Sequence, residues 1–168
     1  NGSLISFDPN LRLSLWKTPE EARRRILYGM KQCDIMKISE EEVAFVSEQE
    51  SLEKGVSFIR DNSDIKILFV TLGNKGSIAY YKDEKIYCGG IHQEHVVDTT
   101  GAGDTFCGAV LSRILELGTD ALTEKDIREM LLFANAAASI VVTRKGALCS
   151  MPEPEEIRAA SSLIDKVL

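Results

Sequence analysis

The chain has 168 residues, 44% of them hydrophobic and 27% charged, and its formal net charge is −6. These values are ordinary for a globular domain with a core of its own. The negative charge argues against nucleic acid or an anionic membrane as the main partner, so a phosphate site would be a local arrangement. No apolar run approaches the roughly 20 residues of a membrane-spanning helix, and no signal-peptide pattern opens the chain.

Alternating strand and helix signals predict an α/β fold with a largely parallel sheet. A buried strand is expected over residues 4–7, and Thr18 followed by Pro19 indicates the start of a helix. The further expected elements are a strand over 34–38, helices from about 39 and over 52–61, a buried strand over 65–72, a hairpin of strands 77–81 and 85–88, and helices over 103–117, 124–141 and 153–167. Since no repeat or linker interrupts this pattern, it indicates one domain or half-domain.

The cysteines and histidines do not form a metal-binding or disulfide pattern. His92 and His95 make an H-x-x-H pair in an expected loop, with no further Cys or His nearby to complete a metal site. The cysteines are scattered and include no C-x-x-C pair: Cys33, Cys88, Cys107 and Cys149. Their spacing predicts buried, reduced thiols, and therefore a cytoplasmic protein.

The segment Asp98-Thr-Thr-Gly-Ala-Gly-Asp104 leads directly into an expected helix. Small residues at Gly101, Ala102 and Gly103 allow backbone N–H groups to approach a ligand, and the helix directs its unpaired N–H groups and positive dipole end to the same place. This pattern predicts an anion site, best suited to phosphate. Asp104 would repel such a ligand, and its presence is explained if it removes a proton from an attacking hydroxyl.

Other interpretations of this segment fit less well. A dinucleotide-binding G-x-G-x-x-G motif would require glycine at position 106, where Phe106 stands, and the Gly-Lys-Ser/Thr of a P-loop occurs nowhere in the chain. An acid in the first turn of a helix is the common explanation of an isolated Gly-Asp pair. Seven residues in this order make that explanation less favoured.

Five segments resemble, in order, those of the ribokinase-like (PfkB) carbohydrate kinases. They are Phe7-Asp-Pro-Asn-Leu-Arg12 with Trp16, Lys37-Ile-Ser-Glu-Glu-Glu42, Thr71-Leu-Gly-Asn-Lys-Gly76, Asp98 to Asp104, and Val142-Thr-Arg-Lys-Gly-Ala147. The first two look most like the fructokinase branch. The resemblance implies a ribokinase-like three-layer α/β/α fold. It also implies that residues 1–168 are the C-terminal nucleotide-binding and catalytic part of such a domain, without the N-terminal half that carries most sugar-binding residues and the lid.

This resemblance implies an enzyme that transfers phosphate from ATP to a sugar hydroxymethyl group, with fructose as the expected substrate and fructose 6-phosphate as the product. The alternatives are another kinase of the family, acting on 2-keto-3-deoxygluconate, ribose or a nucleoside, and a non-catalytic nucleotide-binding fragment. The implied cofactors are ATP and Mg²⁺, while activation by K⁺ and its absence are equally expected. The parent protein is expected to be a homodimer, and a half of it alone is expected to be inactive and to self-associate through exposed apolar surface.

By resemblance, Asp104 is the catalytic base, and the backbone amides of Gly101, Ala102 and Gly103 stabilise the charge on the moving phosphate. The residues implied for the nucleotide are Thr71, Gly73, Gly76 and Asn135, and those implied for the sugar are Asp8, Asn10 and Arg12. Simpler explanations stay open for three of these sets: a hairpin turn at 71–76, a helix-packing role for Asn135, and an Arg12–Asp8 ion pair.

The resemblance also implies two sets of metal-binding residues. Glu42 is expected to organise Mg²⁺ through water. Ser39 and Glu42 also match a capping box, in which each side chain binds the backbone N–H of the other residue, and both roles can hold together. The residues implied for a monovalent cation, mostly through backbone carbonyls, are Asp98, Thr100, Arg144, Gly146 and Ser150.

Overall fold

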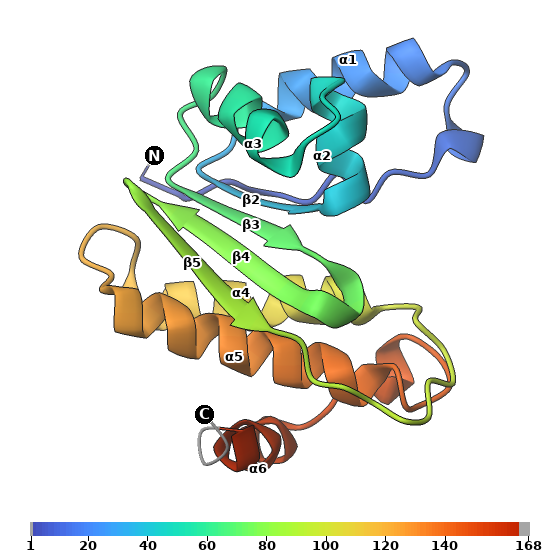
Figure 1. Cartoon of the computed structure of the whole chain (residues 1–168), viewed down its shortest axis with the longest axis vertical. Coiled ribbons are helices and arrows are strands. Elements are labelled where there is room, and N and C mark those ends of the chain that lie inside the picture. The colour runs from blue at the N-terminus through green and yellow to red at the C-terminus, as the bar shows by residue number, and fades with distance from the viewer. Residues whose placement is uncertain (1, 165–168) are drawn as a thin grey trace. The chain divides into compact units, whose positions relative to one another are not determined.

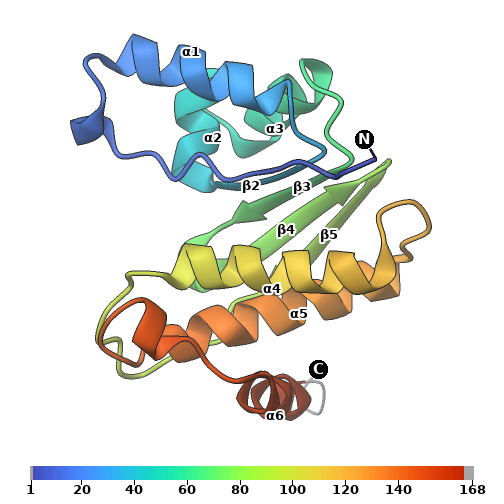
Figure 2. The same ribbon diagram turned by 180° about the vertical axis from the view of Figure 1, so that it is seen from behind.

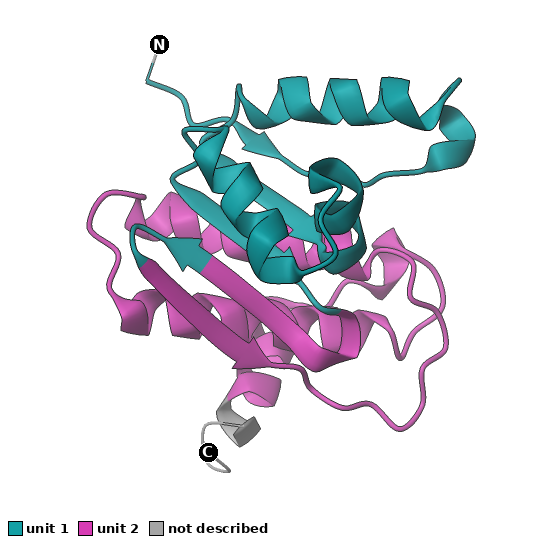
Figure 3. Cartoon of the chain, turned by 45° about the horizontal axis from the view of Figure 1, so that its top comes forward, with its two compact units in different colours: residues 1–72, 80–83 teal, residues 73–79, 84–168 magenta. Residues whose placement is uncertain are grey.

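Five strands are hydrogen-bonded in the order β1-β2-β3-β4-β5 in the computed structural model, which describes residues 2–164. Contacts divide the chain into two compact units (Figure 3). Unit 1 comprises Asn1–Leu72 and Tyr80–Asp83, and unit 2 comprises Gly73–Ala79 and Glu84–Leu168. The expected α/β class is confirmed.

Unit 1 is a parallel sheet with helices on one side of it (Figure 1). Its elements are β1 (Ser6–Phe7), a 3₁₀ helix (Leu13–Leu15), α1 (Pro19–Met30), β2 (Ile35–Ser39), α2 (Glu40–Ser47), α3 (Leu52–Asp61) and β3 (Ile67–Thr71). β1 pairs with β2, and β2 with β3, so that Phe7 lies opposite Met36, and Ser39 opposite Thr71. The carboxyl ends of all three strands therefore point the same way.

Local signals account for the helices of unit 1. The Thr18 hydroxyl accepts a hydrogen bond from the N–H of Glu21 at 3.1 Å, and Pro19 occupies the first helical position, as predicted for α1. Ala22, Ile26 and Met30 recur at helical spacing and are buried. The helix that starts after Ser39 and the helix over 52–61 also form as predicted.

The first strand differs from the prediction. A buried strand was expected over residues 4–7, but β1 covers only Ser6–Phe7, and the side chains of Leu4 and Ile5 are 42% and 52% exposed. The physical reason is the position of β1 at the end of the strand order, where it has a partner, β2, on one side only. The apolar sequence identified a strand but could not place it within the sheet.

Unit 2 contains a hairpin and three helices (Figure 2). They are β4 (Gly76–Tyr81), whose last two residues belong to unit 1, β5 (Glu84–Gly89), α4 (Ala102–Leu117), α5 (Glu124–Val141), a 3₁₀ helix (Leu148–Ser150) and α6 (Pro154–Ile164). α4 packs beside α5, and α5 contacts both β5 and α6. The predicted bounds of α4 and α5 are met to within one residue, and the end of the predicted helix over 153–167 lies outside the described residues.

The thiols are only partly as predicted. Cys33 is buried, and burial raises its pKa to about 11. Cys88 and Cys107 are half-buried, and Cys149 is exposed, so the prediction of buried thiols is wrong for Cys149. In the 3₁₀ turn Leu148–Ser150 it is Ser150, not its cysteine neighbour, that occupies the buried position. In the described part of the chain, no helix has the length and apolar character needed to cross a bilayer.

Candidate functional site

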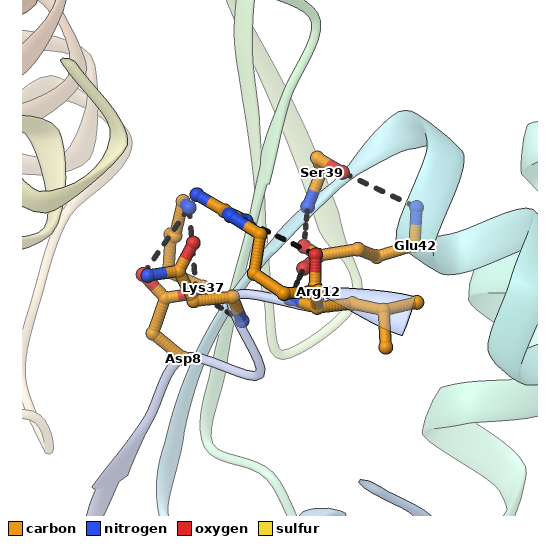
Figure 4. A network of polar contacts seen from close by, with 7 residues as sticks. Asp8, Arg12, Lys37, Ser39 and Glu42 are labelled. Atoms are coloured by element: carbon orange, nitrogen blue, oxygen red, sulfur yellow. Dashed lines mark hydrogen bonds and ion pairs between the residues drawn. The ribbon is translucent and has the colours of Figure 1, made fainter. Parts of the chain in front are cut away.

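The polar residues predicted for the sugar and for magnesium lie at the carboxyl ends of the parallel strands of unit 1 (Figure 4). The loop 8–12 follows β1, and α2 follows β2. Thr71 ends β3 opposite Ser39. Ligands gather at such strand ends in open α/β sheets, because the chain must turn there and presents loop side chains and helix starts together.

Asp8 forms an ion pair with Lys37, with 3.2 Å between Asp8 Oδ2 and Lys37 Nζ. The two side chains are only 17% and 7% exposed. Burial raises the pKa of the Asp8 carboxyl above its ordinary value, while the charge and the hydrogen bond of Lys37 oppose that rise and the charge of Glu42 adds to it. The pair is therefore a largely desolvated charge interaction beside the expected ligand.

Arg12 is not paired with Asp8. Its guanidinium donates to the carbonyl of Leu11 at 3.0 Å and is exposed, whereas Asp8 pairs with Lys37. The alternative of an Arg12–Asp8 ion pair is therefore wrong. Within the described chain Arg12 keeps most of its donors available for an oxygen-rich ligand.

Ser39 and Glu42 form the capping box that their spacing predicts. The Ser39 hydroxyl accepts from the N–H of Glu42 at 3.2 Å, and Glu42 Oε2 accepts from the N–H of Ser39 at 2.8 Å. The other oxygen, Oε1, accepts from the N–H of Leu11 at 2.6 Å, and the side chain is buried. A carboxylate oxygen has a second lone pair, so these bonds fit a water-mediated contact with Mg²⁺.

Metal ligands are otherwise sparse. Over residues 2–164, no three His, Cys, Asp or Glu side chains come together in a group that could hold a metal ion. Magnesium commonly keeps several waters and takes one or two protein carboxylates plus substrate phosphates. A site of that kind is compatible with Glu42, but a site made by the protein alone is not seen.

Lys37 is a residue of this cluster to which the sequence analysis assigned no role. It stands in β2 beside Ile35, Met36 and Ile38, which are apolar and buried. Lysine is almost never buried without a partner. A lysine inside a buried strand was therefore a signal for a carboxylate nearby, although the sequence could not say which one.

The start of α4 lacks the side-chain cap that α1, α2, α3 and α5 have. Thr18, Ser39, Ser51 and Thr123 each accept an N–H from the first turn of α1, α2, α3 and α5, respectively. The position is occupied in α4 by Gly101, at a φ of 84°, with no side-chain bond. In the described chain, the N–H groups of Gly103 and Asp104 meet no acceptor. Two free donors, small neighbours and the positive helix end suit the binding of an anion, as the sequence predicts for this turn.

Asp104 stands at this helix start and is exposed. Gly101 lies close to a second loop, because a Cβ at Gly101 would come within 3.3 Å of Ala147. Its left-handed φ also favours glycine. The predicted catalytic residues Gly101, Ala102, Gly103 and Asp104 are therefore placed together on one turn of backbone.

The residues predicted for a monovalent cation are also brought together. Asp98 Oδ1 accepts from the N–H of Thr100 at 2.9 Å, and Oδ2 from the N–H of Gly146 at 3.4 Å. Hydrogen bonds from Thr100, first its side chain and then its N–H, and from the N–H of Gly146 lower the pKa of Asp98. The Ser150 hydroxyl donates to the carbonyls of Gly146 and Ala147, and Arg144 donates to the carbonyl of Ser150. Two loops, 98–101 and 144–150, are thereby held side by side.

The residues predicted for the nucleotide are divided between the two units. Thr71 ends β3 in unit 1, while Gly73 and Gly76 belong to unit 2. Asn135 is buried in α5, where its Oδ1 accepts from Ser77 at 2.9 Å and its Nδ2 donates to the carbonyls of Cys88 and Gly89, both at 3.2 Å. Such bonds support the helix-packing alternative for Asn135.

A parallel sheet with polar loops at its strand ends, and a glycine-rich turn that opens an uncapped helix, are the features expected of an α/β protein that binds phosphate. The sequence model of the pfkB family of carbohydrate kinases matches residues 1–154, and the chain belongs to that family.

Individual relatives agree with this assignment. Fructokinase-1 from Oryza sativa subsp. japonica is 42% identical over 158 residues, covering 93% of this chain and 48% of that protein. A double mutant of fructokinase from Vibrio cholerae O395, in fructose, ADP and potassium ion bound form, has a TM-score of 0.84 and 33% identity, over 93% of this chain and 49% of that one. Aminoimidazole riboside kinase from Salmonella enterica, complexed with aminoimidazole riboside and an ATP analog, has a TM-score of 0.82 and 27% identity, over 96% and 53%. The chain spans about half the length of the curated relatives it matches.

Proposed function

We propose that the protein is an ATP-dependent sugar kinase that phosphorylates a hydroxymethyl group of fructose and gives fructose 6-phosphate. The observation that carries the proposal is the uncapped start of α4, where two free N–H groups stand beside an exposed carboxylate. Fructokinase relatives that are about 40% identical over most of the chain support fructose as the sugar. The half-length of the chain motivates a further proposal, that residues 1–168 are the nucleotide-binding and catalytic part of a longer kinase.

The chemistry follows from the groups at this helix. Asp104 takes the proton of the attacking hydroxyl, so that the sugar oxygen bonds to the γ-phosphorus as the bond to ADP breaks. The free N–H groups of Gly103 and Asp104, on the positive end of α4, stabilise the negative charge of the moving phosphate, whereas the N–H of Ala102 donates to the carbonyl of Thr99 at 3.3 Å. Bound Mg²⁺ would neutralise charge on the ATP phosphates, with Glu42 as its protein contact through water.

The remaining residues supply binding. Asp8, Asn10 and Arg12 offer a carboxylate, an amide and a guanidinium at one strand end, which suits a ligand rich in hydroxyl groups. The loops that Asp98 holds together present carbonyls for K⁺, and a related fructokinase has potassium in its bound form. Thr71, Gly73, Gly76 and Asn135 stay predictions for the nucleotide, as do the cytoplasmic location and the homodimer.

The test is ADP release by this chain with Mg-ATP and K⁺, offered fructose, ribose, 2-keto-3-deoxygluconate or adenosine. Fructose-dependent release supports the proposal, and preference for adenosine would favour a nucleoside kinase such as the riboside kinase relative. Replacing K⁺ with Na⁺ in the same assay tests the cation, since equal rates would contradict K⁺ activation. Calorimetry with Mg-ATP tests the nucleotide site itself: binding supports it, and a chain that binds no nucleotide would contradict both the catalytic part of a kinase and the alternative of a non-catalytic nucleotide-binding fragment.

A further inference from the structure

We propose that Glu42 is a positioning residue that holds the loop 8–12 in the conformation in which it meets the sugar, with Lys37 fixing the first residue of the same loop. The inference rests on the proposed function for the role of the loop. The attachment of the loop stands on geometry alone. Holding the loop is a task of Glu42 that is distinct from a contact with magnesium.

The attachment joins segments that are far apart in the sequence. Glu42 lies in the first turn of α2, and its Oε1 accepts the N–H of Leu11, 31 positions earlier, at 2.6 Å. Its Oε2 accepts the N–H of Ser39 at 2.8 Å. One buried carboxylate thereby ties the loop after β1 to the end of β2, as Figure 4 shows. Hydrogen bonds from N–H groups to a carboxylate are among the stronger ones in proteins, and burial strengthens them further.

The point of attachment is the middle of the binding loop. Leu11 is half-buried, whereas its neighbours Asn10 and Arg12 are exposed. Holding the Leu11 N–H therefore fixes the backbone from which two of the predicted sugar-binding side chains extend. Asp8, at the start of the loop, is held separately by Lys37 at 3.2 Å.

The loop backbone needs such support. Asn10 has a φ of 43°, in the left-handed region that is unfavourable for most residues and tolerated by asparagine. Its N–H donates to Asp8 Oδ1 at 3.2 Å, so the ion pair with Lys37 and this turn share one carboxylate. Without its two attachments, a loop in this conformation has other backbone states available.

The first experiment measures amide hydrogen exchange by NMR in this chain. Glu42→Gln keeps the side-chain length but replaces one acceptor oxygen with an NH₂ group, so exchange at Leu11 or Ser39 should quicken by at least about tenfold. Glu41→Gln is the matched control, because it removes the same charge from the same helical turn at an exposed position. Unchanged amides in α4 and α5 would show that the variant is folded. Unchanged exchange at both Leu11 and Ser39 would overturn the proposal.

The second experiment separates positioning from magnesium binding. With the fructose-dependent assay, Glu42→Gln and the shortened carboxylate Glu42→Asp should both raise the KM for sugar, by up to about 100-fold for a displaced binding loop, whether or not the Mg²⁺ dependence changes as well. A raised requirement for Mg²⁺ with an unchanged KM for sugar would overturn positioning in favour of a metal contact. Lys37→Met should also raise the KM for sugar, whereas Lys66→Met, which removes an exposed lysine paired with Asp34, should not.

Failure of the proposed function looks different from failure of this inference. If neither the wild-type chain nor a longer chain with the N-terminal half restored turns over sugar, the kinase proposal loses its support, and the exchange of Leu11 and Ser39 still decides whether Glu42 holds the loop. If turnover occurs and both amides exchange as in the wild type, the kinase proposal stands and the positioning role is overturned.

Discussion

Asp104 is the residue on which the proposed chemistry depends most directly. It lies in the first turn of α4, exposed, beside the two N–H groups that have no acceptor in the described chain. A negative charge at that point opposes the binding of a phosphate, and the task of accepting a proton would explain its presence there. Replacing Asp104 is therefore the most direct test of the proposed chemistry by a single substitution.

Asp104→Asn should lower sugar-dependent turnover by about 10²–10⁴, the usual loss when a general base is removed, with little change in the affinity for Mg-ATP. Turnover is measured by ADP release, and affinity by calorimetry. Asp64→Asn, at an exposed acid between α3 and β3, serves as the control and should change neither quantity. Near wild-type turnover in Asp104→Asn would remove this residue from the mechanism.

The backbone around Gly76 leaves no room for a side chain. Its φ of 106° is unfavourable for any other residue, and a Cβ there would collide with the carbonyl oxygen of Cys88. Gly76→Ala should therefore lower the free energy of unfolding by at least about 1–3 kcal/mol. Gly108→Ala, inside α4 and with no atom within 4 Å of the added Cβ, should instead raise it by about 0.5–1 kcal/mol. Urea unfolding measures both, and equal effects would contradict the strain at Gly76.

At the scale of an element, α5 depends on the capping box at its start. The Thr123 hydroxyl accepts from the N–H of Asp126 at 3.2 Å, and Asp126 Oδ2 accepts from the N–H of Thr123 at 2.8 Å. Thr123→Ala should lower the free energy of unfolding by about 1 kcal/mol. Ser112→Ala is the control, because it lies at an exposed position inside α4 and removes no cap, and it should change the free energy of unfolding little. A Thr123→Ala variant as stable as the wild type would show that packing alone holds the start of α5.

The same cap predicts a dependence on pH. Hydrogen bonds from Thr123, first its side chain and then its backbone N–H, lower the pKa of Asp126. A carboxyl with a lowered folded-state pKa adds stability above its unfolded pKa and loses it as the pH falls through the folded value. Asp126→Asn should therefore have a lower Tm than the wild type at pH 7, and the gap should close in acid. A difference in Tm that widens as the pH falls would contradict the prediction.

At the scale of the whole molecule, the exposed apolar residues that directly precede the edge strand β1 have the largest consequence. Leu4 and Ile5 are about half exposed at the end of the strand order, and edge strands of this kind pair with other chains. We expect the chain to self-associate, and Ile5→Lys to reduce its sedimentation mass at high concentration. Leu115→Lys, at an exposed apolar position of α4, is the control and should not. A wild-type chain that stays monomeric would contradict the prediction.

Most elements could be predicted because their signals are local. Thr18 with Pro19, the Ser39–Glu42 pair and the Thr123 cap each act within one helical turn, so neighbouring residues suffice to identify them. The predicted anion site at α4 is also local, since one turn of backbone supplies its donors. Residues that act through distant partners could not be assigned in this way, and Lys37 and Asn135 are the clearest examples.

The sequence by itself determined the α/β class, the family resemblance, and the turn on which Gly101 to Asp104 stand together. Only the tertiary structure decided that Lys37 pairs with Asp8 in place of Arg12, that Glu42 holds Leu11, and that Leu4 and Ile5 are exposed. These contacts join residues about 30 positions apart or depend on the place of a strand in its sheet. An apolar pattern specifies which face of a strand is buried but not which strand lies beside it, so such contacts exist only once the strands have paired.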